Sequence, residues 1–459
     1  METFWGSDVW GTFLLIGILL VSLLAGNILR RKIPFLRVSL IPTSVLGGIL
    51  LLLCNGIHKL CTGGEAFFEA EIFGANPFAT LEILTYHCLA LGFIASSLKS
   101  SGSKLNKDRV VEIFNTGVTT VSTYLLQAII GFGITIVAAL IIAGFFPAAG
   151  ILLPFGYGQG TGQALNYGGI YEEMGFIGGK SFGLTIAALG FLSASIGGVV
   201  HLNIMRKKGQ IQPSQSESVR LNEQVEEDNE IPMQESIDKM TVQVALIAVA
   251  YMIAYGLMVL LGLLLPGMKS VIYGFNFLLG VLAATLVKFV MKLLKKTKLR
   301  NREYTNNFLL TRTSNFFFDL MVVAGIAAIR LGALEQYWGI MLILGVVGLF
   351  ITYFYNYWIA KRFFPKYPQE QFLMMYGMLT GTASTGTILL READPAFKTP
   401  AADNMVYQNF PAIAFGFPMM LLATLAPKKP YLTMILLVAF FAVMNVILFR
   451  SFIFRRKKK

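Results

Sequence analysis

Two polar, glycine-rich stretches hold the residues of this chain whose types and spacing could do chemistry. The first is Gly156 to Ala164 (GYGQGTGQA) and the second is Gly377 to Thr387 (GMLTGTASTGT). Both interrupt apolar sequence, although an interior glycine costs a helix about 1 kcal/mol relative to alanine. In lipid, irregular backbone is tolerated only where protein buries it or where it lines a cavity. A pair of such interruptions at matching places in two halves of a chain is typical of a transporter's binding site.

The first stretch offers oxygen atoms without charge. Its glycines alternate along the chain, so that backbone carbonyls and amides can point into a cavity. Unwound carbonyls and hydroxyls are ligands that suit sodium without burying a net charge. Close helix packing through small residues is the alternative, but it needs small residues along one helix face, and the alternation favours a binding site. The candidate binding residues are Gly158, Gln159, Gly160, Thr161, Gly162, Gln163 and Asn166, with Thr161 and Asn166 as sodium ligands.

The second stretch offers hydroxyls and leads into a charged segment. Half-helix N-termini in this region could hold a carboxylate through free amides and the positive end of the helix dipole. Arg391 either adds a charged partner for that carboxylate or is a loop cation beside Glu392 and Asp394. The candidate residues are Gly381, Thr382, Ser384, Thr385, Thr387 and Arg391, with Thr385 as a sodium ligand.

Asp319 lies inside an apolar segment, residues 306–331. A carboxylate at membrane depth costs roughly 2.5–3.5 kcal/mol on insertion scales, so it is functional by default. Arg312 is on the same helix face but about 10 Å away along the axis, too far for a direct ion pair. We therefore expect Asp319 to be a sodium ligand, directly or through water; a structural hydrogen-bond acceptor and a proton carrier are the alternatives.

These residues sit in a chain that composition assigns to a membrane. Hydrophobic residues make up 55% and charged residues 14% of it, and the mean hydropathy is +0.65. Because globular domains carry about 25% charged residues, soluble classes are excluded. The net charge of +13 lies in particular loops, which indicates membrane topology and not a nucleic-acid partner. We expect no cofactor other than a coupling sodium ion.

Eleven spans are predicted from the length needed to cross a bilayer, about 20 residues. Basic residues such as Arg30, Arg31 and Lys32 follow the first span, which places the N-terminus outside and the C-terminus in the cytoplasm of a multi-pass protein of the inner (plasma) membrane. Segments 147–170 and 370–391 are predicted to be re-entrant hairpins, because counting either as a crossing breaks the charge alternation. The spans are 11–29, 38–56, 79–98, 115–144, 182–204, 240–264, 269–291, 306–331, 338–360, 404–426 and 431–453.

The predicted fold is therefore all-α, with two inverted five-helix repeats, each holding one hairpin, and one extra C-terminal helix. An odd number of spans in each repeat inverts the second copy relative to the first. Residues 1–208 form the first repeat and 239–426 the second. Residues 209–238 are an acidic cytoplasmic linker whose composition cannot bury a core, and residues 427–459 are the extra helix with a basic tail.

The residues resemble those of the bacterial sodium/glutamate symporters. Gly158 to Ala164 (GQGTGQA) is similar to that family's GGHGTGAA motif, with Gln159 in place of the histidine. Ile41 to Gly48 (IPTSVLGG) is similar to its IPEPVAGG motif, and Gly381, Thr385 and Thr387 follow its second glycine-threonine run. The resemblance covers roughly residues 10–426. It implies an inverted-repeat fold with two hairpins meeting near the membrane midplane, a homodimer, and an elevator-like movement of the domain that carries the hairpins.

The function that follows is sodium-coupled symport of a small anionic substrate, a carboxylate such as glutamate or a related amino acid. Proton coupling and another organic anion are the alternatives within this class. An ion channel is the alternative outside it, but a channel needs a continuous polar path and here polarity is confined to two hairpins. An intramembrane enzyme is disfavoured, because the chain has no HExxH motif and Asp319 is its one clearly buried aspartate.

Overall fold

The elements of the chain are helices in every part that the computed structural model describes, residues 5–64, 66–99, 106–210, 230, 237–297, 302–395 and 397–453. No β-strand occurs among these residues, which confirms the predicted all-α class. Ten helices are long and apolar enough to cross a membrane: α1 Ser7–Lys32, α3 Thr43–Thr62, α4 Pro77–Leu98, α5 Lys107–Ile141, α7 Gly179–Lys207, α8 Lys239–Leu264, α10 Asn276–Lys296, α11 Asn307–Ala327, α12 Trp338–Phe363 and α17 Pro430–Ile453.

An eleventh span exists if one bent pair of helices is counted as a single crossing. The pair is α15, Ala401–Tyr407, and α16, Asn409–Leu425, which meet at an angle of 50°. The multi-pass membrane character is thus confirmed, and the predicted count of eleven holds when this pair is one span. The remaining helices outside the hairpins are short: α2 Pro34–Val38, η1 Phe67–Glu69, η2 Glu71–Phe73, α9 Lys269–Gly274, η4 Pro266–Met268 and η5 Leu331–Leu334.

Several long helices begin at a side chain that caps their free amides. Asn76 Oδ1 accepts from Ala79 N at the start of α4, and Asn306 Oδ1 accepts from Leu309 N at 2.7 Å at the start of α11. Such caps satisfy amides that the helix itself leaves unpaired and stabilise a helix by about 1 kcal/mol. These two asparagines therefore mark where α4 and α11 begin.

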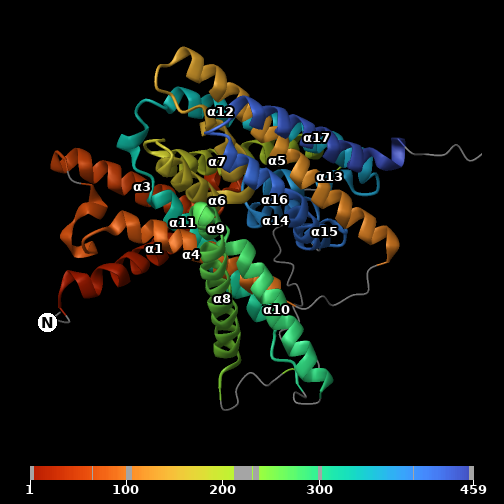
Figure 1. The fold of residues 1–459 in the computed structure, drawn as a ribbon, viewed down its shortest axis with the longest axis horizontal. Coiled ribbons are helices and arrows are strands. Elements are labelled where there is room, and N and C mark those ends of the chain that lie inside the picture. The colour runs from red at the N-terminus through yellow and green to blue at the C-terminus, as the bar shows by residue number, and fades with distance from the viewer. Residues whose placement is uncertain are drawn as a thin grey trace, which may run out of the picture.

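The helices pack as two groups. We call the first group the frame: α1, α3, α4, α8, α9, α10 and α11. We call the second the hairpin bundle: α5, α6 (Leu152–Glu173), α7, α12, α13 (Pro368–Thr380), α14 (Ala383–Ala393), α15, α16 and α17. Each half of the chain gives its first three long helices to the frame and its remaining helices to the hairpin bundle. Figure 1 shows α8 and α10 projecting together away from the hairpin bundle, with α1, α3 and α4 at its flank.

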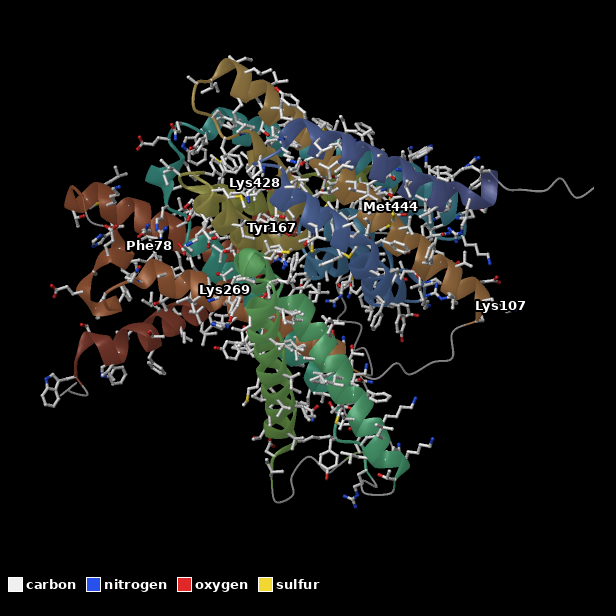
Figure 2. All side chains as sticks on the ribbon, in the orientation of Figure 1. Phe78, Lys107, Tyr167, Lys269, Lys428 and Met444 are labelled. Carbon is white, nitrogen blue, oxygen red and sulfur yellow. The ribbon has the colours of Figure 1, made fainter. Side chains whose placement is uncertain are left out.

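The two groups meet around the centre of the molecule. Figure 2 shows Tyr167 near the middle, between Phe78 at the start of α4 and Lys107 at the start of α5. The α4 helix of the frame contacts α6 of the hairpin bundle, and α11 contacts α6 and α7. The first of the hairpins predicted from the glycines therefore lies where frame and bundle touch.

The segment between the halves and the chain end lie partly outside the described residues. Of the predicted linker, residues 211–229 and 231–236 are outside, as are residues 454–459 of the basic tail. Glu230 is described, and its Oε2 accepts from Lys239 Nζ and Asn306 Nδ2, each at 2.7 Å. The linker is thus attached to the frame at this point. The last helix, α17, packs along α5, where Arg450 Nη1 donates to Asn115 Oδ1 at 3.0 Å.

The three cysteines are unpaired, and they differ from one another in burial. The sequence shows no CxxC pair and no histidine at zinc spacing beside them, so it predicts buried apolar positions, with a Cys54–Cys61 pair as the alternative. Cys88 is buried in α4, but Cys54 and Cys61 are exposed on α3. The prediction of burial is therefore wrong for Cys54 and Cys61, whose side chains no other described part of the chain covers.

Candidate functional site

The first glycine stretch forms a helical hairpin. Residues 147–151 are a 3₁₀ turn that leads into α6, Leu152–Glu173, and α6 is interrupted at Gly160, where φ is 75° and ψ is −171°. Phe155 and Tyr167 lie on either side of the interruption and stack with ring centroids 3.7 Å apart. A straight helix would separate them by about 18 Å. The chain therefore reverses at Gly160 and α6 consists of two arms.

Most glycines of this hairpin serve packing. A Cβ on Gly158 would lie 2.1 Å from Tyr124 Cε1, and a Cβ on Gly162 would lie 2.8 Å from Leu89 Cδ1. Gly160 differs from both, because a positive φ with ψ near 180° is a region that is essentially restricted to glycine. Close packing thus explains Gly158 and Gly162, whereas Gly160 provides the backbone conformation at the tip of the hairpin.

The second glycine stretch forms a matching hairpin. Its arms are α13, Pro368–Thr380, and α14, Ala383–Ala393, separated by Gly381 and Thr382. A Cβ on Gly377 would lie 2.8 Å from Gly386 Cα, so that small residues let the arms approach closely. The observed hairpins extend slightly beyond the predicted ranges 147–170 and 370–391.

The tips of the two hairpins meet. A Cβ on Gly160 would lie 3.2 Å from Thr382 Cγ2 and 3.8 Å from Gly381 O. Thr161 Oγ1 donates to Met321 O of α11 at 3.3 Å, which ties the first tip to the frame. Gln127 Nε2 of α5 donates to Leu379 O at 2.9 Å and ties the second tip to the hairpin bundle. Residues far apart in the sequence therefore converge on one place.

A cavity of about 160 Å³ lies at these tips, between the frame and the hairpin bundle. Helices α4, α10 and α11 line one side of it, and both hairpins with α16 line the other. No aspartate, glutamate, lysine or arginine contributes to its lining. The polar residues that face it include Gly158, Gln159, Gln163, Thr382, Ser384 and Gln408.

Amide groups in this lining lack protein partners. Gln163 is buried, and neither its Nε2 nor its Oε1 has a hydrogen-bond partner among the described residues. The same holds for Gln159 Nε2 and Gln408 Oε1. A buried polar atom left unpaired costs about 1–3 kcal/mol, so such atoms belong where a ligand or water can satisfy them. The lining offers both donors and acceptors to a small polar molecule.

Helix ends of both signs point at the same cavity. The second arm of α6 and the whole of α14 begin at the tips, so their first amides are free and carry partial positive charge. The first arm of α6 and α13 end there, and their last carbonyls carry partial negative charge. The free amides favour an anion, and the free carbonyls favour a cation.

The structure brings many of the predicted site residues together. Gly158, Gln159, Gln163, Gly381, Thr382 and Ser384 line the cavity. Gly160 is at the contact between the tips, and Thr385 is buried with its Oγ1 3.5 Å from Thr382 Oγ1. Thr161 is buried just behind the tip, on the side of α11.

Four predicted residues lie elsewhere. Gly162 packs on Leu89, and Asn166 Nδ2 donates to Gly274 O at 3.1 Å, toward the frame. Thr387 Oγ1 donates within its own helix to Ala383 O at 2.9 Å. Arg391 is exposed, with its guanidinium over the ring of Phe397. None of the four lines the cavity.

Asp319 is half-buried on α11 but turned toward α3. Its carboxylate lies beside Ser44 of α3, whereas Phe318 and Met321 of the same helix line the cavity. This position favours the alternative of a structural hydrogen-bond acceptor, and the role of a sodium ligand stays a prediction. The structure does not bring Asp319 to the hairpin tips.

Sequence reasoning missed two residues at the site. Tyr124 of α5 donates from its hydroxyl to Gly158 O at 2.9 Å and lines the cavity. Gln408, between α15 and α16, faces the cavity from the second half of the chain. Their signal in the sequence was a lone polar side chain in or beside an apolar run, a pattern that many packing residues share.

Polar contacts join the frame and the bundle at one end of their interface. Lys180 Nζ of α7 is 2.8 Å from Glu82 Oε2 of α4, and Arg330 Nη2 is 2.8 Å from Glu82 Oε1. Ser270 Oγ of α9 donates to Glu173 Oε2 at 2.6 Å. Glu82 is paired with two cations because α7 and the loop after α11 meet beside it.

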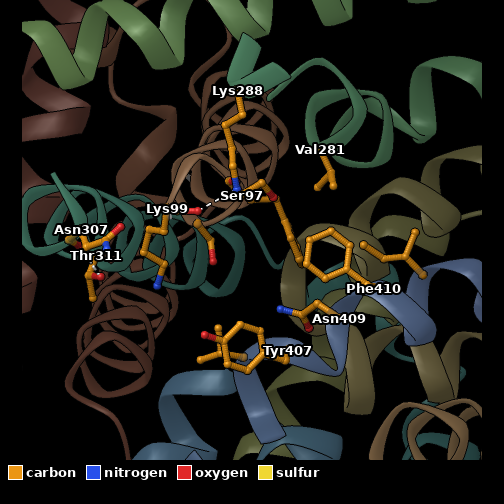
Figure 3. A pocket seen from close by; sticks show the side chains of 13 residues that line it. Ser97, Lys99, Val281, Lys288, Asn307, Thr311, Tyr407, Asn409 and Phe410 are labelled. Carbon is orange, nitrogen blue, oxygen red and sulfur yellow. Dashed lines mark hydrogen bonds between the residues drawn. The ribbon is translucent and has the colours of Figure 1, made fainter. Parts of the chain in front are cut away.

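The other end of the interface is hollow. A second cavity, of about 270 Å³, lies between α4, α10 and α11 of the frame and α15 and α16 of the bundle (Figure 3). It shares Phe93, Ser96 and Asn409 with the cavity at the hairpin tips. On the side of Glu82 a hollow of about 410 Å³, lined by Glu82, Lys180 and Glu173 among others, shares no residue with the cavity at the hairpin tips. The site is therefore separated from the hollow at the base of the first hairpin and adjoins the hollow on the opposite side.

Comparison of the chain with protein-family models and with curated proteins finds no match. The resemblance to sodium/glutamate symporters stays a prediction. Its two best motifs occupy different places: Gly158 to Ala164 surrounds the first tip, while Ile41 to Gly48 leads into α3 of the frame. Gly47 in the latter packs against Ser22 of α1, where a Cβ would lie 3.0 Å from Ser22 O.

Proposed function

We propose that the chain is a sodium-coupled secondary symporter that imports a small carboxylate, such as glutamate or a related amino acid, across the inner (plasma) membrane. The observation that carries this proposal is the neutral cavity where two hairpin tips meet, with unpaired amides of Gln159, Gln163 and Gln408 in its lining. A small molecule with donors and acceptors satisfies these groups. A cavity of this kind between two helix groups is the arrangement that secondary transporters use.

Sodium has a definite role in such a site. The lining contains no cationic side chain to balance a carboxylate and no carboxylate to balance a cation. Hairpin carbonyls and the Thr382 and Thr385 hydroxyls would hold Na⁺, and its charge would then stabilise an anion at the free amides of α14. Each ligand binds better with the other present, which is the physical basis of coupling. A net charge moved across the membrane gains about 2.3 kcal/mol per 100 mV.

Transport follows from relative movement of the two helix groups. In this proposal the halves are inverted repeats, the hairpin bundle moves as an elevator against the frame, and the frame holds two chains together as a homodimer. The polar contacts around Glu82 keep one side closed while the hollow beside Lys99 gives access from the other. With the N-terminus outside and the C-terminus inside, the closed side is the external one.

Two alternatives differ in observable ways. A proton-coupled carrier of another organic anion is favoured by the carboxylate of Asp319, which is half-buried in a membrane helix. An ion channel would need a continuous path open at both ends, whereas the hollow beside Glu82 shares no lining residue with the cavity at the hairpin tips.

The experiment is uptake into proteoliposomes with an imposed sodium or proton gradient. L-glutamate, L-aspartate and succinate are the substrates to compare. We expect saturable, concentrative uptake of at least one of them with the sodium gradient and none with the proton gradient alone. Uptake driven by protons without sodium would assign the alternative carrier, and non-saturable flux would assign a channel.

A variant of the cavity tests the site itself. Gln163→Met keeps the size of the side chain but removes both unpaired polar atoms, so we expect substrate affinity to fall roughly tenfold or more. Gln336→Met, at an exposed position before α12, is the matched control and should transport as the wild type does. Equal kinetics for the two variants would remove Gln163 from the site.

A further inference from the structure

The hollow beside the hairpin tips has a chemical character of its own. It borders the cavity at the tips and shares residues of α4 and α16 with it. Two lysines line it, Lys99 just after α4 and Lys288 on α10, and no acidic residue does. The lining of the cavity at the tips has no charged residue, so the two adjoining cavities differ in charge.

The two lysines are engaged differently. Lys288 Nζ donates to Ser97 O at 3.1 Å and to Lys99 O at 2.7 Å. These carbonyls end α4, so Lys288 neutralises the negative end of that helix. Lys99 is half-buried, and its ammonium has no ion-pair or hydrogen-bond partner among the described residues. Figure 3 shows that ammonium directed into the space between Thr311 and Tyr407.

Further donors face the same space. Asn409 Oδ1 accepts from Gln408 Nε2 at 3.0 Å, which leaves the Asn409 amide nitrogen available to donate. Figure 3 shows that nitrogen pointing toward the side of Lys99, with the Tyr407 hydroxyl nearby. One charged and two neutral donors thus surround a hollow large enough for a small acid.

We propose that Lys99, Asn409 and Tyr407 form a second carboxylate-binding site, where the anionic substrate pauses between the solution on this side and the hairpin tips. The inference rests on the proposed function, since it concerns the path of that same substrate. A permanent positive charge beside a neutral binding cavity raises the local concentration of an anion and its rate of entry. Lys99 is a binding residue of the path and not a ligand in the cavity at the tips.

The test is side-specific transport kinetics in vesicles of known orientation. The variants are Lys99→Gln, Lys99→Glu and Lys99→Arg, and the matched control is Lys292→Gln, which removes an exposed lysine of α10 outside the cavity. Measured from the side of Lys99, KM for L-glutamate should rise roughly 5- to 30-fold in Lys99→Gln. It should rise further in Lys99→Glu and stay near the wild-type value in Lys99→Arg and Lys292→Gln.

The outcomes separate the inference from the function on which it rests. If wild-type protein carries none of L-glutamate, L-aspartate and succinate with sodium, the proposed function fails, and the inference with it. If the wild type transports but all Lys99 variants match Lys292→Gln on both sides, only the inference is overturned. A KM that rises equally on both sides, together with a lower unfolding temperature, shows a structural role for Lys99 and also overturns it.

Discussion

Replacing Gly160 by alanine tests the geometry of the first hairpin tip. At φ 75° and ψ −171° a residue with a Cβ is strained by about 1–3 kcal/mol. The added Cβ would also lie 3.2 Å from Thr382 Cγ2, so the tips must separate by a few tenths of an ångström. A loss of this size lowers the population of correctly formed tips roughly 5- to 150-fold.

The assay is sodium-driven uptake together with thermal unfolding of the purified protein. We expect Gly160→Ala to reduce the maximal rate about tenfold or more and to lower the unfolding temperature. Gly256→Ala is the control, because Gly256 is in α8 and a Cβ there would meet no atom within 4 Å. That variant should keep wild-type uptake and gain up to about 1 kcal/mol of helix stability.

A second substitution separates the two contributions. Thr382→Ser removes Cγ2 but keeps the hydroxyl, so Gly160→Ala combined with it should recover the steric part of the loss only. Full recovery would show that backbone strain at Gly160 is absent. Wild-type uptake and unfolding temperature in the single variant Gly160→Ala would refute the geometry of the tip altogether.

Three further predictions concern other parts of the site. Glu82→Gln leaves Lys180 without its charged partner across the interface, so a cysteine placed at Leu165 should react faster with a membrane-impermeant maleimide. Tyr124→Phe removes the donor to Gly158 O, which should lower the free energy of unfolding by about 1–2 kcal/mol in thermal denaturation. Burial lowers the pKa of the Lys99 ammonium, and its protonated form binds anions; KM from that side should therefore rise with pH through the lowered pKa, below the usual value of about 10.4.

Each of these has a control. Glu71→Gln changes an exposed carboxylate, and labelling at Leu165 should be unaffected; equal labelling in both variants would show that Glu82 does not hold the interface closed. Tyr255→Phe, at a position 58% exposed, should leave stability unchanged. The pH dependence should vanish in Lys99→Gln, and its survival there would assign it to Lys288 or Tyr407, the other titratable groups in that lining.

The hairpins could be predicted because glycine is costly in an apolar helix. Glycine-rich interruptions at matching places in two apolar halves have few structural explanations. The observed break points, Gly160 and Gly381–Thr382, lie inside the ranges predicted for the two hairpins. Which glycine makes the turn could not be predicted. The answer depends on Tyr124 and Leu89, which press on Gly158 and Gly162 from other helices.

The place of Asp319 could not be predicted for a different physical reason. The cost of a buried carboxylate is independent of the direction in which it points, so sequence indicates that Asp319 has a partner but not which one. Rotation of α11 about its axis turns Asp319 to Ser44 and Met321 to the cavity. Gln408 was missed because its role depends on other residues. It lines the same cavity as Gln159 and Gln163, which come from the other half of the chain.

The decisive measurement is equilibrium binding of the transported carboxylate to purified protein during a sodium titration. Sodium and substrate share one neutral cavity in the proposed mechanism, so substrate affinity should rise with Na⁺ and not with K⁺. By reciprocity, substrate should raise the affinity for Na⁺ by the same factor. Gln163→Met should weaken substrate binding at every sodium concentration. Substrate affinity that is the same with and without Na⁺ would contradict the coupling of the two ligands at the hairpin tips.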